Sequence, residues 1–442
     1  MKNLQNIAIS HTDKNFYAKL SSLRKNISDT AAFDQTSANG KKVAQIITDV
    51  KKQGDKAVSK YTLAFDKTKL TPSQFKLTLQ ELKTAHKNID KKLLTSIRKA
   101  IANVRKYQRK IFIGNNKTFG STGIKYTPIE RVGLCIPGAS APLPSTVIMT
   151  AVPALVAGVK EISVISPPRC KGSIHPTILA TCYELGITEV YRIGGVQAVA
   201  ALALGTKTIK PVDMIAGPGN SWVSTAKKML FGQVKIDSIA GPSEVLIVAD
   251  KTANQAYIAA DMLSQAEHAP SGGAVLFTDS KTLANNVILK LNEQLEFLPR
   301  KTQTLEILKK FSLVAVFKSI ADCVHWANKL AAEHLEIHCG KNSRKIADKI
   351  KNAGAIFIGD CSPVATGDYF AGPSHTLPTG GCAKFASALT SNDFIKSSSI
   401  IEYNRQTLKK SKDDIIRLAD AEGLDAHSNS VKIRFKTDKN KG

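Results

Sequence analysis

A carboxylate and an imidazole stand side by side at Glu333 and His334, where a helical pattern ends and an apolar strand pattern begins. Such a pair can share acid–base work, because an imidazole gains and loses its proton near neutral pH. The alternative is a surface carboxylate followed by a histidine that favours the negative end of a helix dipole. The two residue types therefore allow proton transfer here without requiring it.

A carboxamide and a second imidazole lie three residues apart, at Gln265 and His268, in a helical pattern that Pro270 and Gly272 end. Residues three apart share one face of a helix, so these two side chains could bind one metal ion. The alternative is a helix cap or a core histidine.

Further carboxylates and imidazoles occur at Asp368, His375, Glu422 and His427, and the first two flank a loop rich in glycine and proline. A loop of that composition at the end of a strand is more often functional than decorative. Mixed nitrogen and oxygen ligands suit zinc or a neighbouring divalent metal. We interpret the remaining histidines as structural: His11, His86, His175, His325 and His338.

Three turns rich in glycine and proline follow predicted strands, at 137–139, 217–220 and 241–243. In open α/β sheets, ligands bind beyond the carboxyl ends of the strands, where such turns let the backbone approach. None of the turns spells GxGxxG with an acidic residue at the expected distance, so the pattern alone does not identify a nicotinamide cofactor. Simple chain reversal is the alternative.

Two sets of alternating strands and helices must position these residues, and such alternation is typical of βαβ units and a parallel sheet. The first set has strands at 133–136, 161–166, 189–193 and 212–216, with helices at 145–158, 175–186, 197–204 and 221–231. The second has strands at 244–249, 274–278, 313–317, 335–338 and 355–358, with helices at 254–268, 283–298, 320–334 and 343–353. The predicted fold class is α/β, with two doubly wound, Rossmann-like parallel-sheet domains, one of them discontinuous, and small helical N- and C-terminal arms.

The helical segment 42–107 lacks strong strands of its own, so we expect it to pack on the second sheet. The predicted domains are an N-terminal arm (1–28), a discontinuous α/β domain (29–131 and 241–384), an inserted α/β domain (132–240) and a C-terminal arm (385–442). The C-terminal arm has a helix near 413–422 but too little apolar surface to fold alone. It must dock on this chain or on a partner.

The composition indicates a folded protein, since 43% of the 442 residues are hydrophobic and 22% are charged. The net charge of +26 comes from lysines spread along the chain, and no basic run is interleaved with aromatic residues, so we expect no specific nucleic-acid partner.

The seven cysteines form no CxxC pair and fit reduced thiols. No stretch suits a signal peptide or a membrane span, which favours a cytoplasmic location and no membrane partner.

Six segments of the chain resemble motifs of the histidinol dehydrogenases, and the likeness extends over roughly residues 30–435. The segments are 239–245 (IAGPSEV), 263–268 (LSQAEH), 333–336 (EHLE), 367–369 (GDY), 372–381 (GPSHTLPTGG) and 422–427 (EGLDAH). Motifs of this length in the right order are very specific.

The resemblance implies an NAD-dependent, zinc-dependent enzyme that oxidises L-histidinol through L-histidinal to L-histidine, the last step of histidine biosynthesis. It implies one zinc ion per subunit, with Gln265, His268, Asp368 and His427 as ligands. Glu333 and His334 would be the acid–base pair. Around the substrate, the ligands and His334 would be joined by Ser243, His375 and Glu422.

The resemblance also implies that the inserted domain 132–240 binds NAD, with Cys135, Gln197 and Asn220 as contacts, and that the other α/β domain holds metal and substrate. The family forms homodimers in which the C-terminal arm crosses over, so His427 and Glu422 would serve the partner's site. This arrangement would explain an arm that cannot fold alone.

The chain departs from the family pattern at Cys135, where tyrosine is usual, and at Ala139, where a second glycine is common. Ala332 replaces a usual proline, and 381–385 (GCAKF) replaces a form with arginine. We interpret these changes as tuning, because the ligand set and the acid–base pair are intact. Two rival interpretations are a zinc- and NAD-dependent dehydrogenase of another small polar alcohol and a catalytically dead, basic binding protein.

Overall fold

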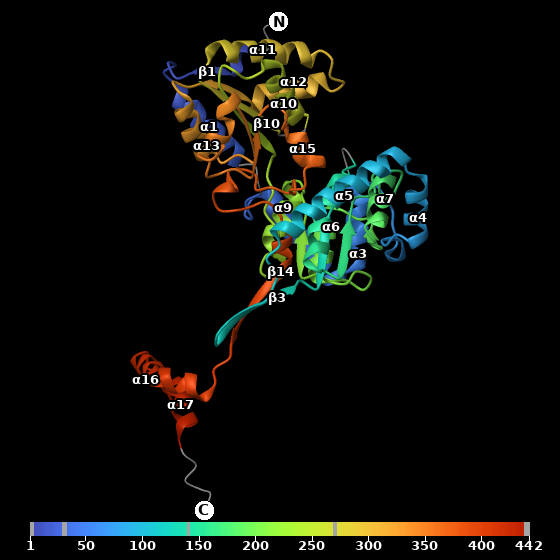
Figure 1. Ribbon diagram of the computed structural model, residues 1–442. Coiled ribbons are helices and arrows are strands. Elements are labelled where there is room, and N and C mark those ends of the chain that lie inside the picture. Colours follow the sequence, from blue (N-terminus) through green and yellow to red (C-terminus); the bar gives the residue numbers. More distant parts are fainter. Residues whose placement is uncertain (1–3, 29–32, 139–141, 268–271, 437–442) are drawn as a thin grey trace, which may run out of the picture. The chain divides into compact units, whose positions relative to one another are not determined.

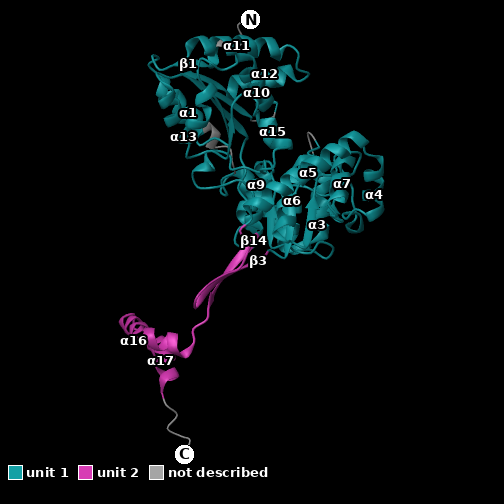
Figure 2. Cartoon of the chain, in the orientation of Figure 1, with its two compact units in different colours: residues 1–112, 129–394 teal, residues 113–128, 395–442 magenta. Residues whose placement is uncertain are grey.

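The computed structural model describes residues 4–28, 33–138, 142–267 and 272–436. The chain forms two units, one of residues 1–112 and 129–394 and the other of residues 113–128 and 395–442, which Figure 2 colours separately. Each unit is described by itself. None of the helices in the described ranges is long and apolar enough to cross a membrane.

A five-stranded parallel sheet with the order β6-β5-β4-β7-β8 lies in the first unit. Its strands are β4 (Arg131–Cys135), β5 (Glu161–Ile165), β6 (Glu189–Tyr191), β7 (Met214–Ala216) and β8 (Lys235–Ile236). The connecting helices are α6 (Pro144–Ala157), α7 (Pro176–Glu184), α8 (Gly195–Leu204) and α9 (Ser221–Leu230). Every residue of β4 is buried, as expected for a parallel strand that is covered on both faces. The prediction of four βα units here is confirmed, with element ends shifted by at most two residues.

A six-stranded parallel sheet with the order β1-β11-β10-β9-β12-β13 lies in the same unit (Figure 1). Its strands are β1 (Ala8–Ser10), β9 (Glu244–Ala249), β10 (Gly273–Thr278), β11 (Leu313–Val316), β12 (His334–His338) and β13 (Ala355–Ile358). Its helices are α1 (Phe16–Ser28), α10 (Gln255–Ala266), α11 (Lys281–Leu295), α12 (Lys301–Phe311), α13 (Ile320–Leu330), α14 (Ser343–Ala347) and α15 (Val364–Tyr369). The predicted second parallel sheet is confirmed. Strand β1 and helix α12 were not predicted.

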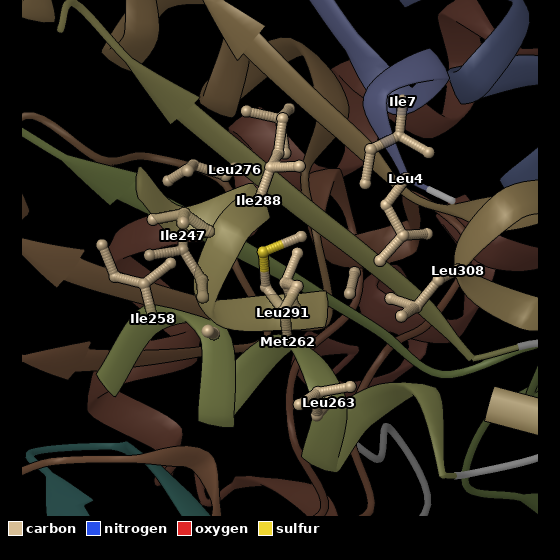
Figure 3. Close-up of a cluster of buried hydrophobic side chains, with 14 of the residues drawn as sticks. Leu4, Ile7, Ile247, Ile258, Met262, Leu263, Leu276, Ile288, Leu291 and Leu308 are labelled. Atoms are coloured by element: carbon tan, nitrogen blue, oxygen red, sulfur yellow. The ribbon is translucent and has the colours of Figure 1, made fainter. Parts of the chain in front are cut away.

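Alternate residues of β9 supply the two apolar layers of this sheet, because successive side chains of a strand point to opposite faces. Val245 and Ile247 join α10, α11 and α12 in one cluster, part of which Figure 3 shows around Met262. Leu246 and Val248 join α1 and α13 in the other cluster. The sheet is therefore covered on both faces.

The helical segment before the first sheet packs differently from our expectation. It forms α2 (Ala38–Gln53), α3 (Asp55–Asp66), α4 (Leu79–Asn88) and α5 (Lys91–Ile111). Helix α2 packs on α8 and α9, α4 on α7, and α5 on α6, so the segment covers the helices of the five-stranded sheet. Helix α8 is apolar around most of its circumference, which explains this packing, because such a helix must be covered on its outer side as well. The expected packing on the second sheet was wrong.

The second unit is an antiparallel three-stranded sheet followed by two helices. The sheet has the order β14-β3-β2, formed by β2 (Lys117–Phe119), β3 (Thr122–Pro128) and β14 (Ile395–Ile401). Helices α16 (Arg405–Ala421) and α17 (Asp425–Lys432) pack on each other. Within this unit Ile401 and Leu418 are 74% and 67% exposed, so its own core leaves large apolar side chains uncovered. The helix predicted near 413–422 exists but begins earlier, and the strand β14 was not predicted.

Candidate active site

The junction of α13 and β12 places Glu333 and His334. Helix α13 ends at Ala331, which adopts a left-handed conformation with φ of 55° that is unusual for a residue other than glycine. The chain then turns directly into β12, and the side chains of Glu333 and His334 are both buried. The predicted acid–base pair therefore lies in a desolvated position where proton affinities can be tuned.

The hydrogen bonds of His334 fix which of its nitrogens can act as a base. Its Nδ1 lies 3.2 Å from the backbone oxygen of Glu244. A carbonyl oxygen can only accept, so this contact requires the proton on Nδ1 and leaves the lone pair of a neutral ring on Nε2. The buried Nε2 has no hydrogen-bond partner among the residues that the structure describes. The ring thus presents a basic nitrogen to the site.

Glu333 faces a second buried carboxyl group, that of Glu244 on the neighbouring strand β9. Oε2 of Glu333 accepts from the backbone amide of Glu244 at 3.2 Å, and Oε1 of Glu244 accepts from the backbone amide of Glu333 at 3.1 Å. Burial, followed by the charge of Glu333, raises the pKa of Glu244 to about 8. Burial and the charge of Asp368 raise the pKa of Glu333 to about 8. Sequence reasoning missed Glu244, although it lies inside the segment 239–245.

Asp368 lies near His334, and His375 contacts Asp368. Oδ1 of Asp368, on α15, lies 3.9 Å from Nε2 of His334. The Nδ1 of His375 lies 3.1 Å from the backbone oxygen of Asp368, and its Nε2 lies 3.2 Å from the hydroxyl of Thr146 on α6. Residues far apart in the sequence therefore converge on His334.

Gln265 and Ser243 complete the part of this site that the first unit supplies. Gln265 lies in the last turn of α10, and its Nε2 donates to the hydroxyl of Ser243 at 2.8 Å. Because its nitrogen is engaged, the Oε1 of Gln265 is the atom that could ligate a metal. The carboxylate of Asp368 is a ligand that zinc accepts beside imidazoles, and the carboxamide oxygen of Gln265 would add a neutral oxygen to the set. His268, the remaining predicted ligand from this helix, lies outside the described residues.

A second polar cluster lies next to this site. Asp261, Glu336 and His338 bring ligand atoms within 4.8 Å of one another, which makes them a group in the described ranges that could hold a metal. Glu336 and His338 follow His334 at every second position of β12 and so share its face. His338 is held between Glu336 and Asp360, at 3.2 and 3.1 Å.

This cluster also anchors α15, because Oε1 of Glu336 accepts from the backbone amide of Val364, the first residue of that helix, at 2.8 Å. Helix α15 carries Asp368, so the cluster supports the predicted ligand that lies near His334. Sequence reasoning assigned His338 a structural role and missed its partners. The alternation of His334, Glu336 and His338 along one strand was the signal that could have found them.

A cavity of about 1220 Å³ lies at the carboxyl ends of the strands of the five-stranded sheet. Its lining includes the three predicted cofactor contacts Cys135, Gln197 and Asn220. Gln197 is fully buried, and both polar atoms of its side chain lack a hydrogen-bond partner within the described residues. An unpartnered buried carboxamide in a cavity wall favours a polar ligand there, because such a group is costly to leave unpaired.

The lining of the cavity includes aromatic residues and also Ser243, which belongs to the site around Gln265. Phe33, Phe65 and Trp222 form an aromatic wall, and Ser243 lines the cavity as well as contacting Gln265. The ring of Phe33 meets that of Trp222 edge to face, with centroids 5.0 Å apart. The aromatic wall suits a flat heteroaromatic ring. Neither Phe65 nor Trp222 was singled out from the sequence, because single aromatic residues carry no spacing signal.

Glu422 and His427 belong to the second unit. Glu422 ends α16, and His427 lies in the first turn of α17. Both side chains are exposed in that unit. The structure thus brings together six predicted residues of the first unit: Ser243, Gln265, Glu333, His334, Asp368 and His375. Glu422 and His427 are part of the second unit.

Comparisons with known proteins identify the family. A family model described as histidinol dehydrogenase matches residues 30–435. A histidinol dehydrogenase of Prochlorococcus marinus subsp. pastoris is 46% identical over 408 residues, covering 90% of this chain and 95% of that relative. One of Oceanobacillus iheyensis is 44% identical over 400 residues, covering 90% and 93%. The crystal structure of histidinol dehydrogenase from Elizabethkingia anophelis superposes with a TM-score of 0.88 at 34% identity, covering 97% of each chain. These matches confirm the resemblance and the α/β fold class, and the chain belongs to the histidinol dehydrogenase family.

Proposed function

We propose that the chain catalyses the NAD-dependent, four-electron oxidation of L-histidinol through L-histidinal to L-histidine, with zinc in the substrate site. Membership of the family makes the chain an oxidoreductase of histidine biosynthesis and implies NAD and a metal. The observation that carries the proposal is the buried Nε2 of His334, which has no partner in the described residues and lies 3.9 Å from Asp368. A neutral imidazole in this position is suited to take a proton from an alcohol.

Zinc would be held by Gln265, His268, Asp368 and His427, with the imidazole and amine of the substrate completing its shell. Bound there, the ion would fix the substrate's orientation. The hydrogen bond from Gln265 to Ser243 supports this assignment. It occupies the amide nitrogen of Gln265 and leaves the carboxamide oxygen as the atom that could ligate the ion. The cluster of Asp261, Glu336 and His338 would support α15 rather than bind the catalytic ion.

His334 would take the hydroxyl proton of the alcohol at Nε2, since Nδ1 is already engaged by Glu244. Glu333 would activate the water that adds to the aldehyde, and its raised pKa suits a carboxylate that exchanges protons near neutral pH. Ser243, His375 and Glu422 would hold the substrate.

The cavity beside the five-stranded sheet would hold two NAD molecules in turn, each of which supplies the oxidant for one two-electron step. Gln197, Asn220 and Cys135 would contact the bound NAD, and the side chain of Gln197 would gain the partners it lacks among the described residues. The cavity reaches Ser243, so a nicotinamide at that end would lie next to the substrate.

The C-terminal arm would cross to a second copy of the chain and deliver Glu422 and His427 to that copy's site. The exposed apolar side chains of the second unit, including Ile401 and Leu418, support this proposal because a monomer would leave them in water. The protein would then be a homodimer with two shared sites.

The main alternative is oxidation of another small polar alcohol on the same scaffold. Steady-state kinetics with L-histidinol, with 3-(imidazol-4-yl)propan-1-ol, which lacks the amine, and with L-leucinol, which lacks the imidazole, separates the two. A site that pairs both groups should reject each analogue by roughly 10⁴-fold in kcat/KM. Equal or faster oxidation of either analogue would contradict the proposal, and no NADH with any alcohol would favour a catalytically dead binding protein.

A further inference from the structure

A buried ion pair contacts the start of a loop that lines the proposed cofactor cavity. Lys227, on α9, and Asp237 have side chains that are only 1% and 2% exposed, and the Nζ of Lys227 contacts Oδ1 of Asp237. Burying two charges costs free energy that is regained only through good geometry and further hydrogen bonds. The further partners of this pair therefore indicate what it is built to hold.

Both charged groups bind the backbone of the same residue, Gly217. The Nζ of Lys227 donates to the backbone oxygen of Gly217 at 3.0 Å. Oδ2 of Asp237 accepts from the backbone amide of Gly217 at 2.7 Å, while its Oδ1 accepts from the amide of Ser238 at 2.7 Å. The ion pair thus fixes the amide on one side of Gly217 and the carbonyl on the other.

Gly217 is also fixed by its surroundings. Its φ is 109°, and a Cβ atom at this position would lie 2.3 Å from the backbone oxygen of Cys135. Only glycine can take this conformation so close to the end of β4. The ion pair therefore hydrogen-bonds the amide and the carbonyl of Gly217, a residue that also has no room to move toward β4.

The loop that starts at Gly217 lines the cavity with Pro218, Gly219 and Asn220. Its far end is attached to the helix that carries the lysine, because Oδ1 of Asn220 accepts from the amide of Val223 and caps α9. The loop is therefore anchored at one end by the ion pair and at the other by the cap of the same helix.

We propose that Lys227 and Asp237 are positioning residues for the dinucleotide, because together they hold the loop 217–220 in the shape that faces the cofactor. This inference rests on the proposed assignment of the cavity to NAD. The same sheet contains a second ion-paired group, Arg131 with Glu161 and Glu189, at the opposite end of β4 and outside the cavity lining. That group serves as a control for a purely structural role.

The test compares three variants in the zinc-loaded, full-length protein: Asp237→Asn, the double variant Lys227→Met/Asp237→Leu, and Arg131→Met. The double variant replaces a buried pair by apolar side chains of similar size, a change that proteins often tolerate. Binding of NAD is measured by calorimetry, beside zinc content, thermal midpoint, and kcat at saturating NAD.

We expect both variants at 227 and 237 to raise the Kd for NAD by about tenfold or more, since a displaced loop presents its contacts poorly. Zinc content and kcat at saturating NAD should stay within about twofold of the parent. Arg131→Met should lower the thermal midpoint and leave the Kd for NAD unchanged.

An unchanged Kd in the double variant would overturn the inference, and so would an equal rise in Arg131→Met. If the double variant does not fold, Asp237→Asn decides alone by the same two criteria, because it keeps the size of the side chain. An unaltered parent protein that does not bind NAD would instead refute the proposed function on which the inference rests.

Discussion

Glu244 and Glu333 each accept a hydrogen bond from the backbone amide of the other, at 3.1 and 3.2 Å, on neighbouring strands of one sheet. The exchange ties the acid–base residue to the segment 239–245, whose Ser243 contacts Gln265. It also brings two buried carboxyl groups together, and this raises the pKa of Glu244 to about 8 through burial and the charge of Glu333. Hydrogen bonds thus connect the predicted metal-ligand residue Gln265 with the predicted acid–base residue Glu333 through the segment 239–245.

The raised pKa of Glu244 predicts how stability changes with pH. In the unfolded chain its carboxyl group ionises near the ordinary value of 4.5, whereas in the folded chain it keeps its proton up to about 8. Between these values the folded state binds the extra proton, so this group's contribution to stability is present below pH 4.5 and is lost as the pH rises toward 8. Glu244→Gln should remove that contribution, so the free energy of unfolding of this variant should fall less steeply with rising pH.

Urea unfolding of the metal-free protein at pH 5, 6.5 and 8 measures the effect. The parent should lose stability across this range more steeply than Glu244→Gln. Replacement of the exposed Glu293, Glu293→Gln, serves as the control and should follow the parent. A Glu244→Gln variant whose slope equals that of the parent would show that the two carboxyl groups do not influence each other as described.

His334→Asn should lower kcat by about 10²–10⁴-fold, the usual cost of losing a general base, while the fold is kept. His338→Asn is a matched control on the same face of β12, since His338 is also buried and its ring nitrogens contact Asp360 and Glu336. It should lower the thermal midpoint with a much smaller effect on kcat. Turnover that is unchanged in His334→Asn would give His334 a structural role.

His268→Ala should remove zinc and activity together, because loss of one of four protein ligands opens the metal site. Zinc per subunit is measured after dialysis, beside activity. The exposed histidine His325 on α13 provides the control, and His325→Ala should keep its metal. A His268→Ala protein that still holds one zinc ion per subunit would refute the proposed ligand set.

Much of the fold could be predicted because buried parallel strands consist of short runs of apolar residues, such as Val245 to Ala249. The packing partner of α2 could not be predicted, because the spacing of its apolar residues shows which face of the helix is buried but not which element covers that face. Strand β14 escaped detection because its run Lys396 to Ser399 is polar and exposed, without the alternation that a half-buried strand shows.

The candidate site was predicted unevenly for similar reasons. Glu333 and His334 lie in a long recognisable motif, and the structure brings them together with Asp368 and Gln265 in one region of the first unit. Lys227 and Asp237 are ten residues apart and carry no motif of their own, so only their shared contact with Gly217 reveals them. Contacts between a side chain and a backbone group do not depend on the residue type that supplies the backbone group, so the sequence pattern does not predict them.

Mixing two inactive variants tests the crossing of the C-terminal arm. A His334→Asn chain would still donate a complete arm, and a His427→Ala chain would still supply the acid–base pair. After subunit exchange, heterodimers should therefore regain one complete site, as expected when two copies share residues across a twofold axis. Activity that stays at the level of the separate variants, with heterodimers present, would place the arm on its own chain.

The stoichiometry of NADH formation tests the central claim most directly. The purified, zinc-loaded protein is given excess NAD and a limiting, known amount of L-histidinol, and both NADH and L-histidine are quantified at completion. The account predicts two NADH and one L-histidine for each L-histidinol, because the alcohol and the hydrated aldehyde are oxidised in turn at the site around His334 and Glu333. One NADH per L-histidinol with aldehyde as the final product, or no NADH at all, would contradict it.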